Sequence, residues 1–204
     1  MVDKIQYESF NRHRVVDIAN TSLVVRLLGE YIKPGCIIDL GSGPGDQVAL
    51  WNAKDAGSVK NDVICVDITP FNLTHIKKMG FKAVRHDLQC FPYPFENKSA
   101  DTIISFCVIA HLKNYFDYLQ ECLRILKDDG VLLFKAPNAK LELNQNHYYH
   151  FEERALIKTL ERVGFTRFKA VYPGFKNMFF TKIKQKLPIL NRWGTKRIFL
   201  VVQK

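Results

Sequence analysis

A glycine-rich loop between an apolar run and a helix-like segment constrains the fold of this chain more than any other feature. The apolar run is CIIDL (36–40), the loop contains Gly41, Gly43 and Gly45, and the helix-like segment begins at Asp46. Glycines between a strand and a helix let the backbone turn tightly and approach a ligand, whose polar groups then face the helix N-terminus. The loop therefore predicts a βα unit that binds a nucleotide or nucleoside.

The spacing of these glycines argues against dinucleotide cofactors. A dinucleotide fingerprint has Gly or Ala at the sixth position counted from Gly41, and this chain has Asp46 there. NAD and FAD are therefore disfavoured. Taken by itself, the loop leaves one alternative open, namely a tight turn that only joins a strand to a helix.

Short apolar runs alternate with helix-like segments along most of the chain. Parallel strands that are buried on both faces have this composition, and the helices between them supply right-handed crossovers. We predict strands at 36–40, 62–67, 82–87, 100–106 and 131–136, another from Phe165, and a last one at 197–203. Helices are predicted at 15–32, 46–56, 70–79, 115–127 and 151–163, the fourth closed by residues 127–130. This pattern predicts an α/β fold with a Rossmann-like, doubly wound, mostly parallel seven-stranded sheet whose last strand is antiparallel.

The length of 204 residues predicts a single domain. We divide it into a helical lead-in (1–34), a cofactor-binding core (35–165) and a basic C-terminal part (166–204) whose strands flank an amphipathic segment. The five cysteines form no CxxC pair, and the N-terminal stretch is polar. Both features predict a protein of the reducing cytoplasm.

Carboxylates lie near the ends of the first three predicted strands, at Asp39, Asp67 and Asp87. The carboxyl ends of neighbouring parallel strands border one crevice, so these three side chains could converge on one ligand. Asp67 could accept hydrogen bonds from two ribose hydroxyls, and Asp87 could accept one from an adenine amine. Each aspartate taken singly is also compatible with a solvated loop residue or a helix cap.

At these residues the sequence resembles the class I S-adenosylmethionine-dependent methyltransferases, especially their small-molecule, type 11-like branch. IIDLGSGPG, VICVDITP and the stretch from RHDLQ to IAHL are similar to the first four motifs of that family. LKDDGVLLFKAPN follows at the spacing expected for the fifth strand. The resemblance covers residues 30–165 and implies that S-adenosylmethionine is the cofactor.

The resemblance also implies roles for individual residues. The loop glycines would cradle the methionine part of the cofactor, Asp67 would hold the ribose, and Asp87 and Leu88 would border the adenine. Ser105 and Phe106 would face the transferable methyl group. The predicted cofactor-binding residues are Asp39, Gly41, Ser42, Gly43, Gly45, Asp67, Ile68, Asp87, Leu88, Ser105 and Phe106.

His111, just after the fourth predicted strand, is the candidate catalytic residue. Transfer to a hydroxyl or to a protonated amine requires a base, and an unperturbed histidine has a pKa of about 6.5. Many members of the family have Glu-His here, whereas this chain has Ala110-His111. The alternative is that His111 caps or packs the start of the following helix.

The segment NQNHYYHF (144–151) follows the fifth predicted strand. The resemblance places it beside the acceptor pocket, which makes Tyr148, Tyr149 and His150 candidate substrate-binding residues. His147 and His150 lie three positions apart, but no carboxylate or thiol nearby completes a ligand set. We therefore predict no metal site.

Positive charge is concentrated at the C-terminal end. Residues 1–150 contain 17 Lys and Arg against 17 Asp and Glu, whereas residues 151–204 contain 13 against three. If the part of segment 176–197 before Pro188 is helical, Phe179, Ile183 and Leu187 form an apolar stripe flanked by lysines, which suits an interfacial helix or a lid over an anionic acceptor. A helix docked on the sheet is the alternative. Three anionic partners remain open: a small-molecule or carrier-linked acceptor, RNA, and a membrane surface contacted by 176–197.

The sequence thus predicts methyl transfer to an oxygen or nitrogen atom of a small-molecule or glycan-like, anionic acceptor. An RNA methyltransferase is the first alternative. Against it, the fourth-strand region reads SFCV (105–108) and lacks the Asn-Pro-Pro-aromatic type of motif of many nucleic-acid base methyltransferases. A non-catalytic S-adenosylmethionine-binding interaction protein is the second alternative, and the missing acidic neighbour of His111 is its only indication.

Overall fold

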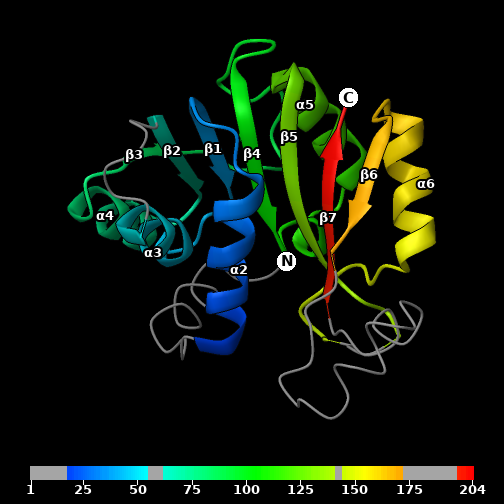
Figure 1. Ribbon diagram of the computed structural model, residues 1–204, viewed down its shortest axis with the longest axis horizontal. Coiled ribbons are helices and arrows are strands. Elements are labelled where there is room, and N and C mark those ends of the chain that lie inside the picture. The colour runs from blue at the N-terminus through cyan, green and yellow to red at the C-terminus, as the bar shows by residue number, and fades with distance from the viewer. Residues whose placement is uncertain (1–17, 55–61, 141–143, 172–196) are drawn as a thin grey trace.

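A computed structural model describes residues 18–54, 62–140, 144–171 and 197–204, and its seven strands form one sheet in the order β3-β2-β1-β4-β5-β7-β6 (Figure 1). β1, β2, β3, β4 and β5 are parallel, whereas β7 pairs antiparallel with both β5 and β6. The predicted Rossmann-like fold with an antiparallel last strand is confirmed. The strands are β1 (Cys36–Leu40), β2 (Asp62–Asp67), β3 (Lys82–Arg85), β4 (Ala100–Phe106), β5 (Leu126–Pro137), β6 (Arg167–Ala170) and β7 (Arg197–Gln203).

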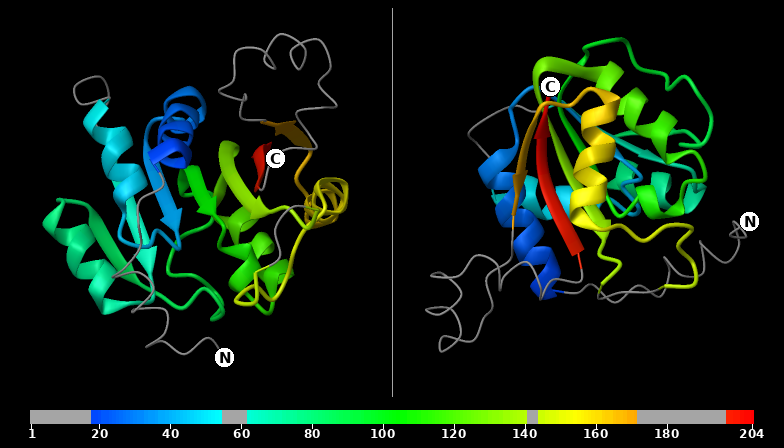
Figure 2. Two further views of the ribbon diagram at one scale, coloured as in Figure 1. Left: turned by 90° about the horizontal axis from the view of Figure 1, so that it is seen from below. Right: turned by 90° about the vertical axis from the view of Figure 1, so that its right-hand side faces the viewer.

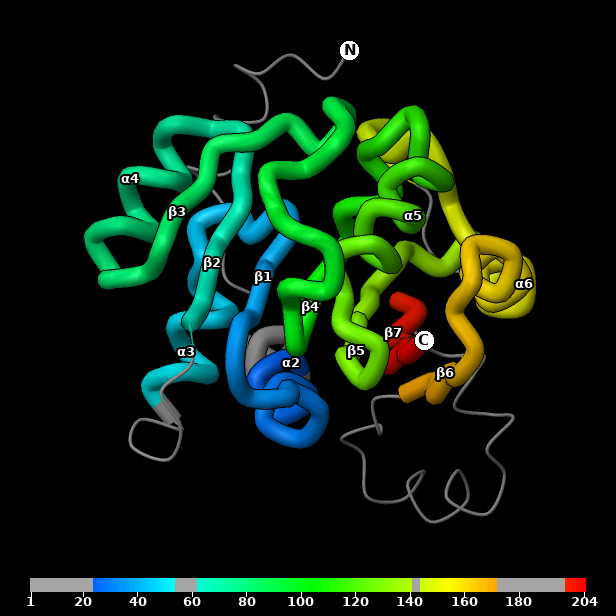
Figure 3. Tube along the Cα trace, turned by 90° about the horizontal axis from the view of Figure 1, so that it is seen from above, coloured from blue at the N-terminus to red at the C-terminus, as the bar shows by residue number. Residues whose placement is uncertain are grey.

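Helices cover both faces of the sheet (Figures 1 and 3). The sheet thus divides the hydrophobic core into two layers, one on each face. Side chains alternate along each strand, so Ile37 packs against one helical layer while Ile38 packs against the other. The first layer consists of α2 (Ile18–Tyr31), α3 (Asp46–Lys54) and α4 (Pro70–Lys78); the second consists of α5 (Tyr115–Ile125) and α6 (Glu153–Val163). A short 3-10 turn, η1 (Ile109–His111), follows β4.

The junction between α5 and β5 differs from the prediction. The helix predicted at 115–127 ends at Ile125, and the strand predicted from 131 already begins at Leu126. Leu126 is fully buried and pairs with Ala100, so burial ends the helix earlier than the polar residues 127–130 suggest. The extra residues are absorbed by a register shift, after which Thr102 pairs with Val131. Residues 127–130 therefore belong to β5 and do not cap the helix.

Other predicted boundaries shift by a few residues. β3 ends at Arg85 and not at 87, and β6 begins at Arg167 because Phe165 is buried in the core before the strand starts. The helix predicted from 151 begins at Glu153, beside β6 at the edge of the sheet (Figure 2). The helix predicted at 15–32 begins outside the described residues, and the helix predicted at 46–56 ends outside them.

The amphipathic segment predicted at 176–197 lies outside the described residues except for Arg197, which opens β7. The interfacial helix and its contacts with membrane or RNA consequently remain predictions. Among the helices of the described ranges, none combines the length and apolar character needed to cross a bilayer.

Candidate functional site

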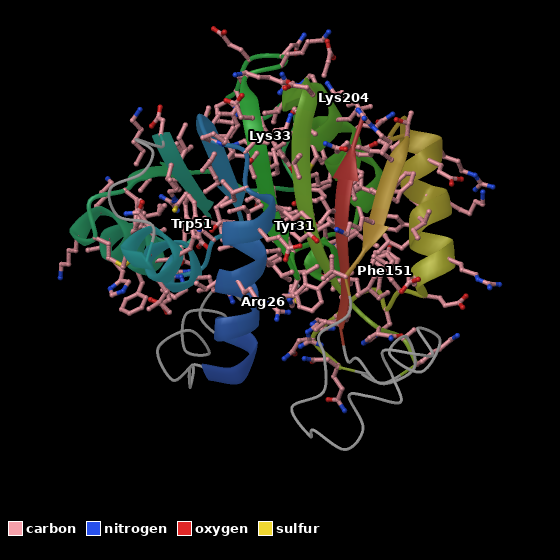
Figure 4. All side chains as sticks on the ribbon, in the orientation of Figure 1. Arg26, Tyr31, Lys33, Trp51, Phe151 and Lys204 are labelled. Atoms are coloured by element: carbon pink, nitrogen blue, oxygen red, sulfur yellow. The ribbon has the colours of Figure 1, made fainter. Side chains whose placement is uncertain are left out.

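The loops that follow the parallel strands gather at one edge of the sheet, the lower edge in Figure 1. They include the glycine loop after β1, the turn after β4 and the long connection after β5. Figure 4 places Phe151, at the end of that connection, toward this edge and Lys204 at the opposite one. In open α/β sheets this carboxyl edge is where ligands bind.

The glycine loop adopts a backbone conformation that side chains would disturb. Gly41, Gly43 and Gly45 have φ angles of 69°, 58° and 82°. A Cβ on Gly41 would lie 2.6 Å from Cγ2 of Val108, in the turn after β4, and a Cβ on Gly45 would lie 3.1 Å from Cγ1 of Ile76. The loop is thus held closely between the turn after β4 and α4.

The amides of this loop are already used within the protein. The N–H groups of Gly41 and Ser42 donate to the Val66 carbonyl at 2.9 and 3.0 Å, and that of Gly45 donates to Ser42 at 3.2 Å. The Gly43 N–H donates to Oδ2 of Asp67 at 3.0 Å. A pyrophosphate needs donors that point outward, so this loop suits a cofactor without phosphates.

Asp67 ties the glycine loop to the start of α4. Its Oδ1 accepts from the N–H of Thr69 at 2.8 Å and from the Thr69 hydroxyl at 2.9 Å, while Oδ2 accepts from Gly43. A carboxylate has about four acceptor positions. Within the described structure one acceptor position remains on Oδ2, so one ribose hydroxyl can bind to it directly. The predicted second ribose hydroxyl can bind to Asp67 only if the Thr69 hydroxyl turns away from Oδ1.

Asp39, on β1 beside the end of β2, is nearly buried, with 6% of its surface exposed. Burial, followed by the charge of Asp67, raises its pKa to about 7, and Lys135 opposes the rise. Lys135 is itself only 4% exposed, and its Nζ lies 5.2 Å from the ring centre of Phe106. Lys135 was not among the predicted site residues, although a lysine inside the apolar run VLLFKAP is unusual for a buried strand.

The predicted adenine-side residues lie in and after the turn that leaves β3. Asp87 sits two residues beyond the strand, where Oδ1 accepts from the N–H of Gln89 at 3.0 Å and its carbonyl accepts from Cys90. Leu88 is buried in the core, and the Ile68 carbonyl accepts from Nε of Arg85 at 3.3 Å. The N–H of His86 donates to the Asp67 carbonyl at 3.2 Å, which brings this turn beside the end of β2.

Ser105 and Phe106 face opposite sides of β4. The Ser105 hydroxyl is fully buried and accepts a 2.6 Å hydrogen bond from the hydroxyl of Tyr118 on α5. Phe106 faces the other side, the α2 side, where it meets Lys135. Of the two predicted methyl-facing side chains, the structure therefore brings only Phe106 toward the face that carries Asp39.

We expect Tyr118→Phe to lower the free energy of unfolding by about 1–3 kcal/mol, because the buried Ser105 hydroxyl loses its partner. Chemical denaturation of the variant measures this loss. The matched control is Tyr118→Phe combined with Ser105→Ala, which removes both polar groups and should recover part of it. A double variant that is less stable than Tyr118→Phe would contradict this account.

Three histidine rings form a cluster at the carboxyl edge. The ring centres of His111 and His147 lie 4.8 Å apart, and those of His147 and His150 lie 5.3 Å apart. Burial and the two neighbouring histidines lower the pKa of His147 to about 4, and burial lowers the pKa of His111. The first two rings are therefore neutral at pH 7. In the sequence, His147 is a candidate only for a metal ligand; within the described ranges no group of His, Cys, Asp and Glu side chains is arranged to hold a metal ion.

Hydrogen bonds fix two of these rings. Nδ1 of His111 donates to the Asn146 carbonyl at 3.2 Å, since a carbonyl can only accept, so the neutral ring has its lone pair on Nε2. Nε2 of His150 accepts from the N–H of Asn144 at 2.9 Å. The predicted alternative for His111, packing at the start of the next helix, is compatible with its place in η1.

An exposed aromatic surface borders the histidine cluster. Tyr148 and Tyr149 are 41% and 37% exposed, and Nζ of Lys113 lies 6.0 Å from the ring centre of Tyr148. The segment is anchored by the N–H of Tyr148, which donates to Ala110 at 2.8 Å, and by the Tyr149 hydroxyl, which donates to the Lys113 carbonyl at 3.1 Å. The predicted acceptor-site residues thus lie next to His111.

A pocket of about 440 Å³ lies elsewhere, at the opposite edge of the sheet beside Lys204. Its cations are already paired within the protein: Arg124 binds Glu121 at 2.7 Å, and Lys98 binds Asp128 at 2.7 Å. Asp128 also lies 3.7 Å from Nζ of Lys204. This pocket contains none of the predicted site residues.

Comparison with known proteins agrees with this arrangement. The family model of the methyltransferase domain matches residues 38–134. A probable S-adenosylmethionine-dependent methyltransferase of Mycolicibacterium smegmatis is 28% identical over 165 residues, covering 76% of this chain and 58% of the relative. The chain spans only about half the length of the curated relatives that it matches.

Two solved structures share the fold. A SAM-dependent methyltransferase from Archaeoglobus fulgidus has a TM-score of 0.73 at 16% identity and covers 97% of this chain and 99% of its own. Phosphoethanolamine N-methyltransferase 2 of Haemonchus contortus, solved in complex with S-adenosyl-L-methionine, has a TM-score of 0.66 at 15% identity and covers 91% of this chain and 52% of its own.

Proposed function

Since the chain belongs to the class I S-adenosylmethionine-dependent methyltransferases, we propose that it methylates an oxygen or nitrogen atom of a small-molecule or glycan-like acceptor that carries negative charge. His111 carries this proposal. It is a half-buried, neutral imidazole at the carboxyl edge, held by the Asn146 carbonyl in the tautomer whose Nε2 can accept a proton.

The residues of the crevice fit S-adenosylmethionine. The internally bonded glycine loop suits a nucleoside without phosphates, and Asp67 keeps an acceptor position for a ribose hydroxyl. The buried carboxylates Asp39 and Asp67 suit a ligand with cationic groups. When bound, this cofactor supplies an electrophilic methyl group on a sulfonium.

The contribution of the protein to the reaction is mainly alignment. Methyl transfer is an in-line displacement in which charge already present is redistributed, so positioning lowers the barrier more than covalent chemistry does. Phe106 lies on the crevice side of β4 and contributes an apolar wall. His111 would remove the proton of the acceptor hydroxyl or amine, and its lowered pKa keeps it ready for this at neutral pH.

Two observations support an anionic acceptor with a flat or ring-shaped part. Lys113 beside the exposed Tyr148 and Tyr149 offers a positive charge next to aromatic faces, close to His111. The excess of positive charge in residues 151–204 acts in the same direction. One structural neighbour, the phosphoethanolamine N-methyltransferase of Haemonchus contortus, is named for a small molecule with a phosphate.

RNA is the second candidate acceptor, favoured by the same charge excess. Phosphate-driven binding weakens steeply as salt rises, so a filter-binding titration of the full chain with RNA at increasing salt separates the two proposals. An affinity that does not depend on salt contradicts the RNA proposal. Binding of S-adenosylmethionine without methyl transfer to any acceptor would favour the second alternative, a non-catalytic S-adenosylmethionine-binding interaction protein.

The direct test is incubation of the full chain with methyl-labelled cofactor and cell extract separated into small-molecule, glycan and RNA fractions. We expect label in a small-molecule or glycan fraction that binds an anion exchanger. The matched control is Asp67→Ala, which should lose the label in every fraction. Label confined to RNA, and sensitive to ribonuclease, would overturn the proposed acceptor class.

With that acceptor, His111→Gln is expected to lower kcat/KM by about 100-fold or more, because general-base catalysis contributes on that scale. The wild-type rate should fall as pH falls through the pKa of His111, which lies below the ordinary 6.5, since protonation removes the base. The pH–rate profile of both proteins measures this. A variant that keeps the wild-type acid limb would exclude His111 as the titrating base.

A further inference from the structure

Three ionisable side chains are buried at the carboxyl end of the sheet on one face, the face covered by α2, α3 and α4; β1 and β2 carry the two carboxyls, and β4 lies between them and the strand of the lysine. Asp39, Asp67 and Lys135 are 6%, 3% and 4% exposed. Each stands two positions beyond a residue of the same core layer, namely Ile37, Cys65 and Leu133. Because side chains alternate along a strand, all three point to that face.

Lys135 is built into this face between two aromatic rings. Phe106 on β4 and Phe199 on β7 are its register partners on either side. Nζ lies 5.2 Å from the ring centre of Phe106 and 5.7 Å from that of Phe199. Aromatic faces attract cations, so the ammonium is stabilised inside the sheet layer, where lysines seldom lie.

The charges that act on Asp39 come from the neighbouring strand β2 on one side and from β5, beyond β4, on the other. Asp67 on β2 repels its negative charge, and Lys135 on β5 attracts it. Cys65, also on β2, has a pKa raised by burial and is a neutral thiol. At the start of α3, Asp46 faces His75 of α4 at 3.6 Å. Lys135 is thus the cation that offsets the buried carboxylate pair.

We infer that Lys135 is a positioning residue that, when Asp39 is ionised, sets the charge of the cofactor crevice at one net negative charge, which matches S-adenosylmethionine and not its demethylated product. S-adenosylmethionine carries a sulfonium, an ammonium and a carboxylate, and therefore one net positive charge. S-adenosylhomocysteine lacks the sulfonium and is neutral overall. Two carboxylates and one ammonium complement the first ligand and favour its exchange for the second after transfer.

This inference rests on the proposed cofactor crevice and does not depend on the acceptor. If it holds, the affinity for S-adenosylmethionine depends on pH through the ionisation of Asp39. Burial raises the pKa of Asp39 to about 7, so below that pH the carboxyl is protonated and the crevice holds a cation less well. Affinity for S-adenosylmethionine should therefore increase as pH rises toward 7.5, by up to tenfold per pH unit.

The experiment is calorimetric titration of the full chain with S-adenosylmethionine and with S-adenosylhomocysteine between pH 5.5 and 7.5. Lys135→Met should displace the rise in S-adenosylmethionine affinity to higher pH, because the pKa of Asp39 rises further without the ammonium. At pH 7 we expect about tenfold weaker binding of S-adenosylmethionine for each unit of that displacement. Lys135→Arg keeps the charge and should follow the wild-type curve. Binding of S-adenosylhomocysteine should change less in every protein.

Three outcomes would overturn the inference. One is a folded Lys135→Met protein with the wild-type pH dependence, and another is Lys135→Arg behaving like Lys135→Met, which would indicate packing and not charge. The third is a ratio of wild-type affinities for S-adenosylmethionine and S-adenosylhomocysteine that does not change between pH 5.5 and 7.5. This measurement needs no variant, so it tests the inference even if Lys135→Met does not fold. If Asp67→Ala binds both ligands normally, the crevice assignment itself fails instead.

Discussion

Asp67→Ala is expected to weaken the binding of S-adenosylmethionine by about 30- to 150-fold, or about 2–3 kcal/mol. The carboxylate organises both sides of the crevice, since Oδ2 holds the Gly43 N–H and Oδ1 holds the N–H and hydroxyl of Thr69. Its loss removes the acceptor for the ribose and releases the glycine loop from α4. Isothermal titration calorimetry of the full chain measures the change in Kd.

Asp62→Ala is the matched control for this variant. Asp62 lies at the opposite end of the same strand, where it is exposed and pairs with Lys82 at 2.7 Å. Removing it deletes an aspartate from β2 without touching the crevice, so Kd should stay near the wild-type value. Unchanged affinity in Asp67→Ala, with circular dichroism showing an intact fold, would refute the assignment of Asp67 to the cofactor.

Gly41→Ala is expected to lower the free energy of unfolding by about 2–5 kcal/mol. Two effects add: a left-handed φ of 69° disfavours a Cβ by about 1–2 kcal/mol, and overpacking against Val108 at 2.6 Å costs about 1–3 kcal/mol. Because the clash displaces the turn after β4 from the glycine loop, cofactor affinity should fall too. Denaturant unfolding and calorimetry measure the two effects.

Gly80→Ala separates strain from clash. Gly80 has a similar φ of 85°, but a Cβ there would meet nothing within 4 Å. It should therefore show the conformational cost alone and leave cofactor binding unchanged. Equal losses of stability in Gly41→Ala and Gly80→Ala would mean that the close approach of Val108 contributes nothing.

Much of the cofactor side was predictable because its determinants are local. The strand, the positive-φ glycines and the following helix occupy one continuous stretch, and Asp67 ends the next strand as predicted. Boundaries were less predictable where burial competed with polar sequence. The polar residues 127–130 resemble a helix end, yet full burial of Leu126 against Ala100 begins the strand there.

The acceptor side and the charge balance depend on contacts between distant segments. His111 and His147 are 36 positions apart in sequence but in ring contact, and the Ser105 hydroxyl, on the face of β4 away from Asp39, accepts a hydrogen bond from Tyr118 of α5. Lys135 gains its surroundings from β4 on one side and from β7, more than 60 residues later, on the other. None of these contacts has a local pattern.

By itself the sequence determined the class of fold, the order of strands along the chain and the tight glycine loop after the first strand, since periodicity and glycine placement act over a few residues. Only the tertiary structure decided which groups share a face and which charges act on one another. The physical reason is that ionisation and hydrogen bonding depend on burial and on neighbours across the sheet. Asp39 is the clearest case: its sequence context identifies a carboxyl near a glycine loop, and only Asp67, Lys135 and burial together determine its charge.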